Sequence, residues 1–161
     1  MSDSLSLDPV DLEILRLLQN DARTTYRDLA AAVGVAPSTC LDRVGRLRRG
    51  GVILGHALRL DPAKLGRSLE ALLSVQVRPH RRELIGPFVE RVRALPESLS
   101  LFHLTGPDDY LVHVAVVDAA DLQRLVLDEF TSHKEVARVE TRLIFQQWSC
   151  GPLLPPGASA T

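Results

Sequence analysis

Cysteines, aromatic residues and long hydrophobic runs are all scarce in this chain of 161 residues. Its two cysteines, Cys40 and Cys150, are too few for the disulfide framework that stabilises many small secreted domains. The five histidines share no ligand spacing with either cysteine, so no metal site is expected. No apolar run approaches the roughly 20 residues of a membrane-spanning helix, and residues 1–7 are too polar for a signal peptide. These absences predict a cytoplasmic protein without a metal, a cofactor or a membrane segment.

Net charge is also small, at −1, while 45% of the residues are apolar. This apolar content is sufficient for one medium domain or two small ones. The charge is uneven, because residues 43–60 contain five arginines and no acid, whereas residues 118–140 are rich in acids. A local basic stripe on a nearly neutral chain favours a site-specific DNA-binding protein over a general nucleic-acid coat. The alternative is a solvated charged face without a binding role.

Residues 36–49 predict one amphipathic helix around which the N-terminal part of the chain is organised. Leu41, Val44 and Leu47 recur at helical spacing and should form its apolar face. Pro37 suits a first helical turn, and the glycines at 50–51 suit its end. Such a helix fits the major groove of double-stranded DNA, with its first turn on base edges and its arginines on phosphates. The residues predicted to contact DNA are Ser38, Thr39, Arg43, Arg46, Arg48 and Arg49.

Two further helices are predicted before this one. The first starts near Pro9, with Asp8 as its N-cap, and closes at residues 20–21. The second follows Thr25, an N-cap residue, and stops at Gly34. Helix, helix, short glycine-containing turn and helix is the order of a helix-turn-helix unit. The three helices together therefore indicate DNA binding more strongly than the basic helix does alone.

The remaining chain predicts a second domain of the α+β class. Residues 52–60 are expected to form a linking strand, so that residues 1–60 make up the DNA-binding domain. Strands are predicted at 69–77, 99–104, 110–117 and 136–146, and helices at 82–94 and 118–130. This βαββαβ order is the ferredoxin-like arrangement and fills a domain at 61–150. The strand at 110–117 is expected to be buried on both faces of the sheet. Residues 151–161 are expected to form a flexible tail or a loose strap. Since the helices cover one sheet face, the other face should be covered by sheet-to-sheet dimerisation.

Short motifs occur in a fixed order through the chain. They include Asp8-x-x-Asp11-x-x-Ile14-Leu15, Leu29-Ala30 with Val33-Gly34-Val35, Ser38-Thr39 with Arg43-Val44-x-Arg46-Leu47, Gly51-Val52-Ile53-x-Gly55, Asp61-Pro62-x-x-Leu65-Gly66 and Gly106-x-x-Asp109-Tyr110. In joint order and spacing, over roughly residues 7–149, the sequence resembles the leucine-responsive regulatory protein/AsnC family, the feast/famine regulators.

The resemblance implies a transcriptional regulator with a winged-helix-like or plain helix-turn-helix domain and a C-terminal effector-binding RAM domain. It also implies homodimers that assemble to octamers, and a small-molecule effector, usually an amino acid. Carried onto this chain, the effector-binding residues are those of one turn and of the last strand: Leu104, Thr105, Gly106, Asp108, Asp109, Tyr110, Thr141, Arg142 and Leu143.

The chemistry of these residues leaves alternatives open. Gly106 lets a ligand approach backbone N–H groups, and Asp108 or Asp109 could accept a bond from an ammonium group. The same turn could instead be a simple hairpin connection. Arg142 could bind an effector carboxylate, or pair with Asp108 or Asp109 and leave the site closed.

The sequence leaves two other functions to consider, a DNA-organising protein and an enzyme. A DNA-organising protein of the nucleoid type would have weak sequence preference and no effector, and its affinity for specific and random DNA would be similar. Ferredoxin-like domains also carry catalysis in many proteins. No pairing of a nucleophile with a base is evident in the sequence, so an enzyme is not expected.

Overall fold

The computed structural model describes residues 6–79 and 82–158. The chain forms two compact units. The first contains the described residues up to Leu58 together with those from Ser149 onward, and the second is Arg59–Trp148. The predicted boundary after residue 60 lies close to this division, but the C-terminal segment belongs to the first unit. Within the described ranges, no helix is both long and apolar enough to cross a lipid bilayer.

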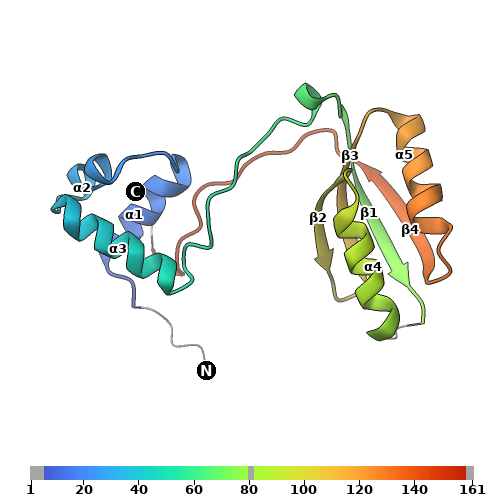
Figure 1. Cartoon of the computed structure of the whole chain (residues 1–161), viewed down its shortest axis with the longest axis horizontal. Coiled ribbons are helices and arrows are strands. Elements are labelled where there is room, and N and C mark those ends of the chain that lie inside the picture. Colours follow the sequence, from blue (N-terminus) through green and yellow to red (C-terminus); the bar gives the residue numbers. More distant parts are fainter. Residues whose placement is uncertain (1–5, 80–81, 159–161) are drawn as a thin grey trace. The chain divides into compact units, whose positions relative to one another are not determined.

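The first unit contains three helices, α1 (Pro9–Asn20), α2 (Tyr26–Val33) and α3 (Pro37–Arg49), in the predicted order (Figure 1). Asp8 caps α1, because its carboxylate accepts from the Asp11 N–H at 2.9 Å while the Asp11 carboxylate accepts from the Asp8 N–H at 3.1 Å. Thr25 caps α2, and Gly34 ends it with a left-handed φ of 71°. The predicted caps of both helices are therefore confirmed.

The core of this unit differs from the prediction at one position of α3. Leu41 was expected in the apolar face, but it is 50% exposed. Cys40 is buried instead, and with Val44 and Leu47 it forms a stripe at spacings of four and three residues, which is one helical face. These side chains pack with Ile14, Leu29 and Ala30.

The predicted linking strand at residues 52–60 is wrong. This segment has no strand conformation, and only a short 3-10 helix, Ala63–Leu65, precedes the sheet (Figure 1). A strand requires a neighbour to pair its N–H and C=O groups. Within the single chain, no strand of the described residues pairs with residues 52–60. The alternation of apolar residues in this segment is therefore not sufficient to form a strand.

The second unit has the predicted βαββαβ order (Figure 1). Its elements are β1 (Leu69–Val77), α4 (Arg82–Ala94), β2 (Ser98–His103), β3 (Tyr110–Val116), α5 (Ala119–Leu125), a π-helical extension (Val126–Thr131) and β4 (Val136–Leu143). The strands pair antiparallel in the order β2-β3-β1-β4. β4 ends at Leu143, earlier than predicted.

One face of this sheet carries the core. Ala71, Leu73, Val75 and Val77 of β1 are fully buried against side chains of α4 and α5, as predicted from their alternation. The prediction that β3 is buried on both faces is wrong in part. From Tyr110 to Val114 its residues alternate, so that Val112 and Val114 are buried, whereas Leu111 and His113 are only half-buried on the open face of the sheet; Ala115 is buried. His113 is held there by Glu70, whose carboxylate lies 2.8 Å from Nε2.

The described C-terminal segment packs on α1 within the first unit. The Gln19 side-chain amide donates to the Leu153 carbonyl at 3.0 Å and accepts from the Leu153 N–H at 2.8 Å. Leu153, Leu154 and Pro155 also line an apolar groove shared with side chains of α1. Of the two expectations for this segment, a flexible tail and a strap, the contacts fit the strap.

Candidate functional site

The first turn of α3 presents the two hydroxyl residues that were predicted to read DNA. Ser38 and Thr39 are both exposed. The N-cap residue, Ala36, has no side chain that bonds the first N–H groups, and no acid lies in the first turn. Unpaired N–H groups and the helix dipole therefore make this end of α3 a favourable place for hydrogen-bond acceptors and negative charge.

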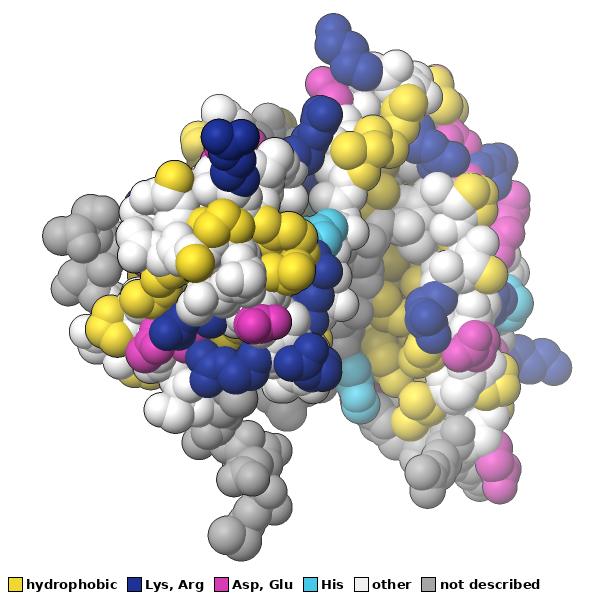
Figure 2. All heavy atoms as spheres, turned by 60° about the vertical axis from the view of Figure 1, so that its left-hand side comes forward, with side chains coloured by type: hydrophobic (Ala, Val, Ile, Leu, Met, Phe, Trp, Pro, Cys, Tyr) yellow, Lys and Arg dark blue, Asp and Glu magenta, His cyan; other side chains and the backbone are white. Residues whose placement is uncertain are grey.

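Arg43 and Arg46 have carboxylate partners in α1. Arg43 Nη1 donates to Asp8 Oδ2 at 2.5 Å and to Asp11 Oδ1 at 3.0 Å, and Arg46 Nη2 donates to Asp11 Oδ2. Asp11 is completely buried. Figure 2 shows basic and acidic side chains next to one another on the surface of this unit. The structure thus gives both arginines, predicted to hold phosphates, the role of fastening α3 to α1.

These contacts shift the ionisation of the groups that make them. The Asp11 N–H and then the Arg43 guanidinium lower the pKa of the Asp8 carboxyl below its usual value. The Asp8 and Asp11 carboxylates in turn raise the pKa of Arg43. The pair of Asp8 and Arg43 therefore remains charged throughout the neutral range.

Arg48 and Arg49 are exposed at the end of α3. Arg48 contacts the His56 ring at 2.8 Å rather than a carboxylate. The Arg49 guanidinium lies over Gly45, where an added Cβ would come within 3.1 Å of it. Of the four arginines predicted to contact phosphates, Arg48 and Arg49 are therefore the two that are exposed at the surface.

The predicted effector turn is fastened to β1. The Asp109 carboxylate accepts from the Val77 N–H at 2.7 Å and from Arg78 at 2.8 Å, and the Asp109 N–H donates to the Val75 carbonyl at 3.0 Å. Leu104 and Asp109 close the turn through a backbone bond of 2.8 Å, and Gly106 adopts a φ of 124° that favours glycine. Leu104, Thr105 and Gly106 are exposed, and Asp108 is half-buried. Asp109 thus contributes to the structure of the turn.

The predicted last-strand residues do not meet this turn within one chain. Thr141 and Leu143 pair with Leu73 and Ala71, whereas Arg142 faces the opposite side of the sheet. Arg142 donates to the Ser74 hydroxyl at 3.0 Å and to Glu140 at 2.9 Å, instead of to Asp108 or Asp109. Arg142 pairs with Leu72 of β1, and Tyr110, beside the turn, pairs with Val75 of the same strand. Arg142 and the turn are therefore three residues apart along β1. That separation is about 10 Å along the strand.

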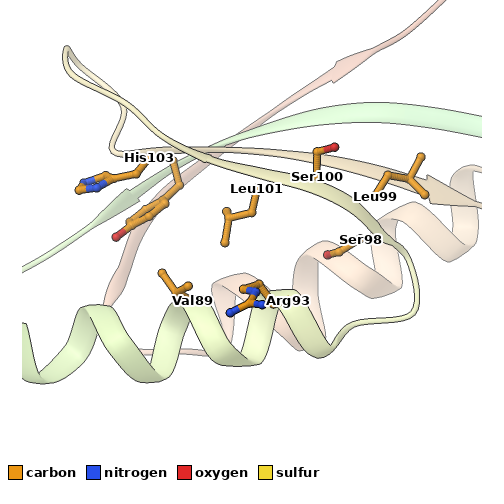
Figure 3. Close-up of a pocket in the computed structure, with 8 residues that line it drawn as sticks. Val89, Arg93, Ser98, Leu99, Ser100, Leu101 and His103 are labelled. Carbon is orange, nitrogen blue, oxygen red and sulfur yellow. The ribbon is translucent and has the colours of Figure 1, made fainter. Parts of the chain in front are cut away.

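A cavity of about 400 Å³ lies between α4 and the edge strand β2 (Figure 3). Its lining residues are Val89, Arg93, Ser98, Leu99, Ser100, Leu101, His103 and Tyr110. Only Tyr110 among them was predicted to belong to a site. The others were missed because their placement depends on how β2 packs on α4, a contact between segments that the sequence pattern does not reveal.

Tyr110 lines this cavity and is almost completely buried. Its ring stacks on His103 at a centroid distance of 4.7 Å and packs against Phe88 at 4.9 Å. Burial raises the pKa of the Tyr110 hydroxyl, and the neighbouring Asp109 charge raises it further. The hydroxyl is therefore a neutral hydrogen-bonding group at physiological pH.

Family models match both halves of the chain. The AsnC-type helix-turn-helix domain covers residues 7–48, and the Lrp/AsnC ligand binding domain covers residues 70–154. The chain is 40% identical over 140 residues to the HTH-type transcriptional regulator AldR of Mycolicibacterium smegmatis, covering 87% of this chain and 82% of AldR. It is 32% identical over 143 residues to the leucine-responsive regulatory protein of Rhizobium meliloti, covering 89% of this chain and 92% of that protein.

A solved structure extends the similarity to the fold. The transcriptional regulator from Neisseria meningitidis crystallised in complex with L-Met is 32% identical to this chain, with a TM-score of 0.85. The match covers 93% of this chain and 97% of that structure. These relatives are named as transcriptional regulators rather than enzymes. With both domain models matched in order and the whole fold shared, the chain belongs to the Lrp/AsnC family of DNA-binding transcriptional regulators.

Proposed function

We propose that this protein is a sequence-specific regulator whose DNA binding or assembly is tuned by a small molecule, namely an amino acid. The observation that carries the first half is the open N-terminal end of α3, where Ser38 and Thr39 are exposed beside N–H groups that no side chain caps. The second half is supported by the match to a ligand-binding domain and by the relative solved with L-Met.

Within this proposal the residues of α3 divide into two roles. Ser38 and Thr39 read base edges in the major groove, while Arg48 and Arg49 bind phosphates and contribute affinity without sequence preference. Arg43 and Arg46 act indirectly, since their carboxylate partners in α1 fix the direction of the reading helix. This division revises the expectation that all four arginines contact DNA.

We further propose that the working form is a homodimer that assembles to an octamer, and that it acts in the cytoplasm, where its DNA lies. The support for dimerisation is the open face of the sheet, on which Leu72, Phe102 and His113 line a hollow of about 710 Å³. Helices cover the opposite face, so a second sheet is the natural partner for this one.

The test is a comparison of affinities for a selected DNA site and for random DNA, at several salt concentrations. A specific regulator should bind its site at least about 10³-fold more tightly than random DNA. A ratio near one, without any response to amino acids, would instead indicate a DNA-organising protein and would refute the proposal.

A further inference from the structure

One row of residues on α3 points away from the core of its unit. The opposite side of the helix is marked by its buried residues, which are Cys40, Val44 and Leu47. Successive residues of an α-helix are turned by about 100° around its axis. The residues that lie across the helix from the buried ones are therefore Ser38, Asp42, Gly45 and Arg49. Asp42 is exposed, so the outward surface of the second helical turn carries a carboxylate.

Asp42 is the one acid in a helix that contains four arginines. In the described part of the chain its carboxylate makes no ion pair or hydrogen bond, although Arg46 lies one turn further along α3. That arginine donates to the buried Asp11 instead. An acid in the first turn would stabilise the helix through its dipole, but Asp42 lies beyond that turn, and aspartate is a weak helix former. The fold of the unit therefore gives no reason for an acid at this position.

Gly45 follows Asp42 in the same row and leaves the surface of α3 without a side chain. Glycine in the interior of a helix lowers its stability, so it often has a packing or functional reason. An added Cβ would meet only the guanidinium end of Arg49, at 3.1 Å, and that flexible end can move. Packing within the unit therefore does not require this glycine. Its absent side chain lets the edges of bases in the major groove come close to the Asp42 carboxylate.

The hydrogen-bonding capacity of a carboxylate selects one base. An ionised carboxylate only accepts hydrogen bonds. In the major groove guanine and thymine present acceptors, whereas cytosine and adenine each present an amino group. Adenine also presents the acceptor N7 beside its amino group, and this nitrogen repels a carboxylate. Cytosine is therefore the base that the Asp42 side chain suits.

We propose that Asp42 is a specificity-determining residue, whose carboxylate accepts a hydrogen bond from the N4 amino group of a cytosine. Its charge also disfavours guanine and thymine at that position, because their oxygen acceptors would face it. On other DNA the carboxylate only faces phosphates and lowers the affinity. The inference rests on the proposed function as a sequence-specific regulator, and it identifies a base that α3 reads beyond its first turn.

Selection of binding sites from a random DNA library tests the base assignment, with the full-length wild type and two variants. The wild type should enrich cytosine at one position of the selected site. Asp42→Ala should lose the preference at that position and keep the preferences at the others. Asp42→Asn should change it from cytosine to adenine, because an amide both donates to adenine N7 and accepts from its N6 amino group. A substitution that only distorted the helix would not create a new base preference.

Affinity measurements separate base reading from a solvated surface charge. Replacement of the cytosine by another base should weaken binding of the wild type about 5- to 150-fold and should leave binding of Asp42→Ala unchanged. Asp42→Ala should also bind random DNA more tightly, and the selected site more weakly, than the wild type does. If Asp42 only faced solvent, its removal would raise the affinity for both DNAs equally, and that result would overturn the inference.

Glu13→Gln is the control for net charge. It removes one acid from α1, where Glu13 pairs with Arg16, and it should select the same site as the wild type. If the wild type selects a site that both Asp42 variants read identically, the inference is refuted and the proposed function stands. If the wild type selects no site, both fail.

Discussion

Arg43 Nη1 lies 3.0 Å from Oδ1 of Asp11, a carboxylate with no exposed surface. Arg46 binds the other oxygen of the same carboxylate. A single buried residue of α1 therefore holds two residues of the reading helix, one turn apart. Because a rigid scaffold must place the side chains that read DNA, this contact connects the stability of the unit to its specificity.

Asp11→Ala should destabilise the helix-turn-helix unit. The change leaves two guanidinium groups without their shared partner, although their side chains are 25% and 40% exposed and water can replace part of the loss. We expect a loss of about 2–3 kcal/mol, below the roughly 3–5 kcal/mol for breaking a fully buried ion pair, because water reaches both guanidinium groups. Chemical unfolding of the full-length protein measures it, with Asp42→Ala on the exposed side of α3 as the control. Equal stability of the two variants would contradict the structural role of Asp11.

Thr39→Ala and Arg49→Ala should affect DNA binding in different ways. Loss of the Thr39 hydroxyl should cost about 1–3 kcal/mol at one base position and relax specificity there. Loss of Arg49 should weaken binding to all sequences and reduce the slope of affinity against salt by about one ion. Anisotropy titrations on a selected site, its single-base variants and random DNA separate these effects. Wild-type behaviour of both variants would exclude α3 as the reading helix.

The first unit should lose stability in acid through Asp8. Its pKa is lowered on folding by the Asp11 N–H and by Arg43, so its contribution is present above the unfolded value of about 3.9. As pH falls through the lower folded value, protonation removes that contribution. Asp8→Asn retains a good N-cap residue but cannot ionise, so its stability should depend less on pH below about 4. Urea midpoints between neutral pH and pH 3 provide the measurement, and parallel curves for the two proteins would contradict this role.

Gln19→Ala should release the C-terminal segment from α1. The substitution removes two hydrogen bonds to the Leu153 backbone, each with a net contribution of about 1 kcal/mol or less, because both are exposed to water. Limited proteolysis should then cut the segment after Ser149 faster, while Asn20→Ala, at the exposed neighbouring position, should be cut at the wild-type rate. Unchanged cleavage of Gln19→Ala would show that the groove alone retains the segment.

Local signals made much of the fold predictable from the sequence. Asp8, Thr25 and Gly34 act on the backbone within a few residues of themselves, so the starts and ends of α1 and α2 could be predicted. The alternation in β1 likewise gave its buried face. The segment at 52–60 failed because alternation indicates a strand only where a pairing partner exists.

The candidate sites depended on contacts that the sequence does not specify. The carboxylate partners of Arg43 are 32 and 35 positions away in sequence. The sequence therefore indicated a basic helix, but it did not indicate that two of the arginines in this helix form ion pairs with α1. The turn at Gly106 was correctly placed between two strands, but its distance from Arg142 follows from strand register. The register of β2 against β3 shifts between Ser98 and Ser100, and no turn residue marks this irregularity in the sequence.

The central claim is that one protein couples DNA binding to a small molecule, and reciprocal titration tests it most directly. The affinity for a selected DNA site is measured with and without saturating amino acid, and the affinity for that amino acid with and without the DNA site. We expect a change of about 5- to 150-fold, equal in both directions because the two equilibria are linked. If no amino acid changes the affinity for DNA, and DNA changes the affinity for no amino acid, regulation by an amino acid is excluded.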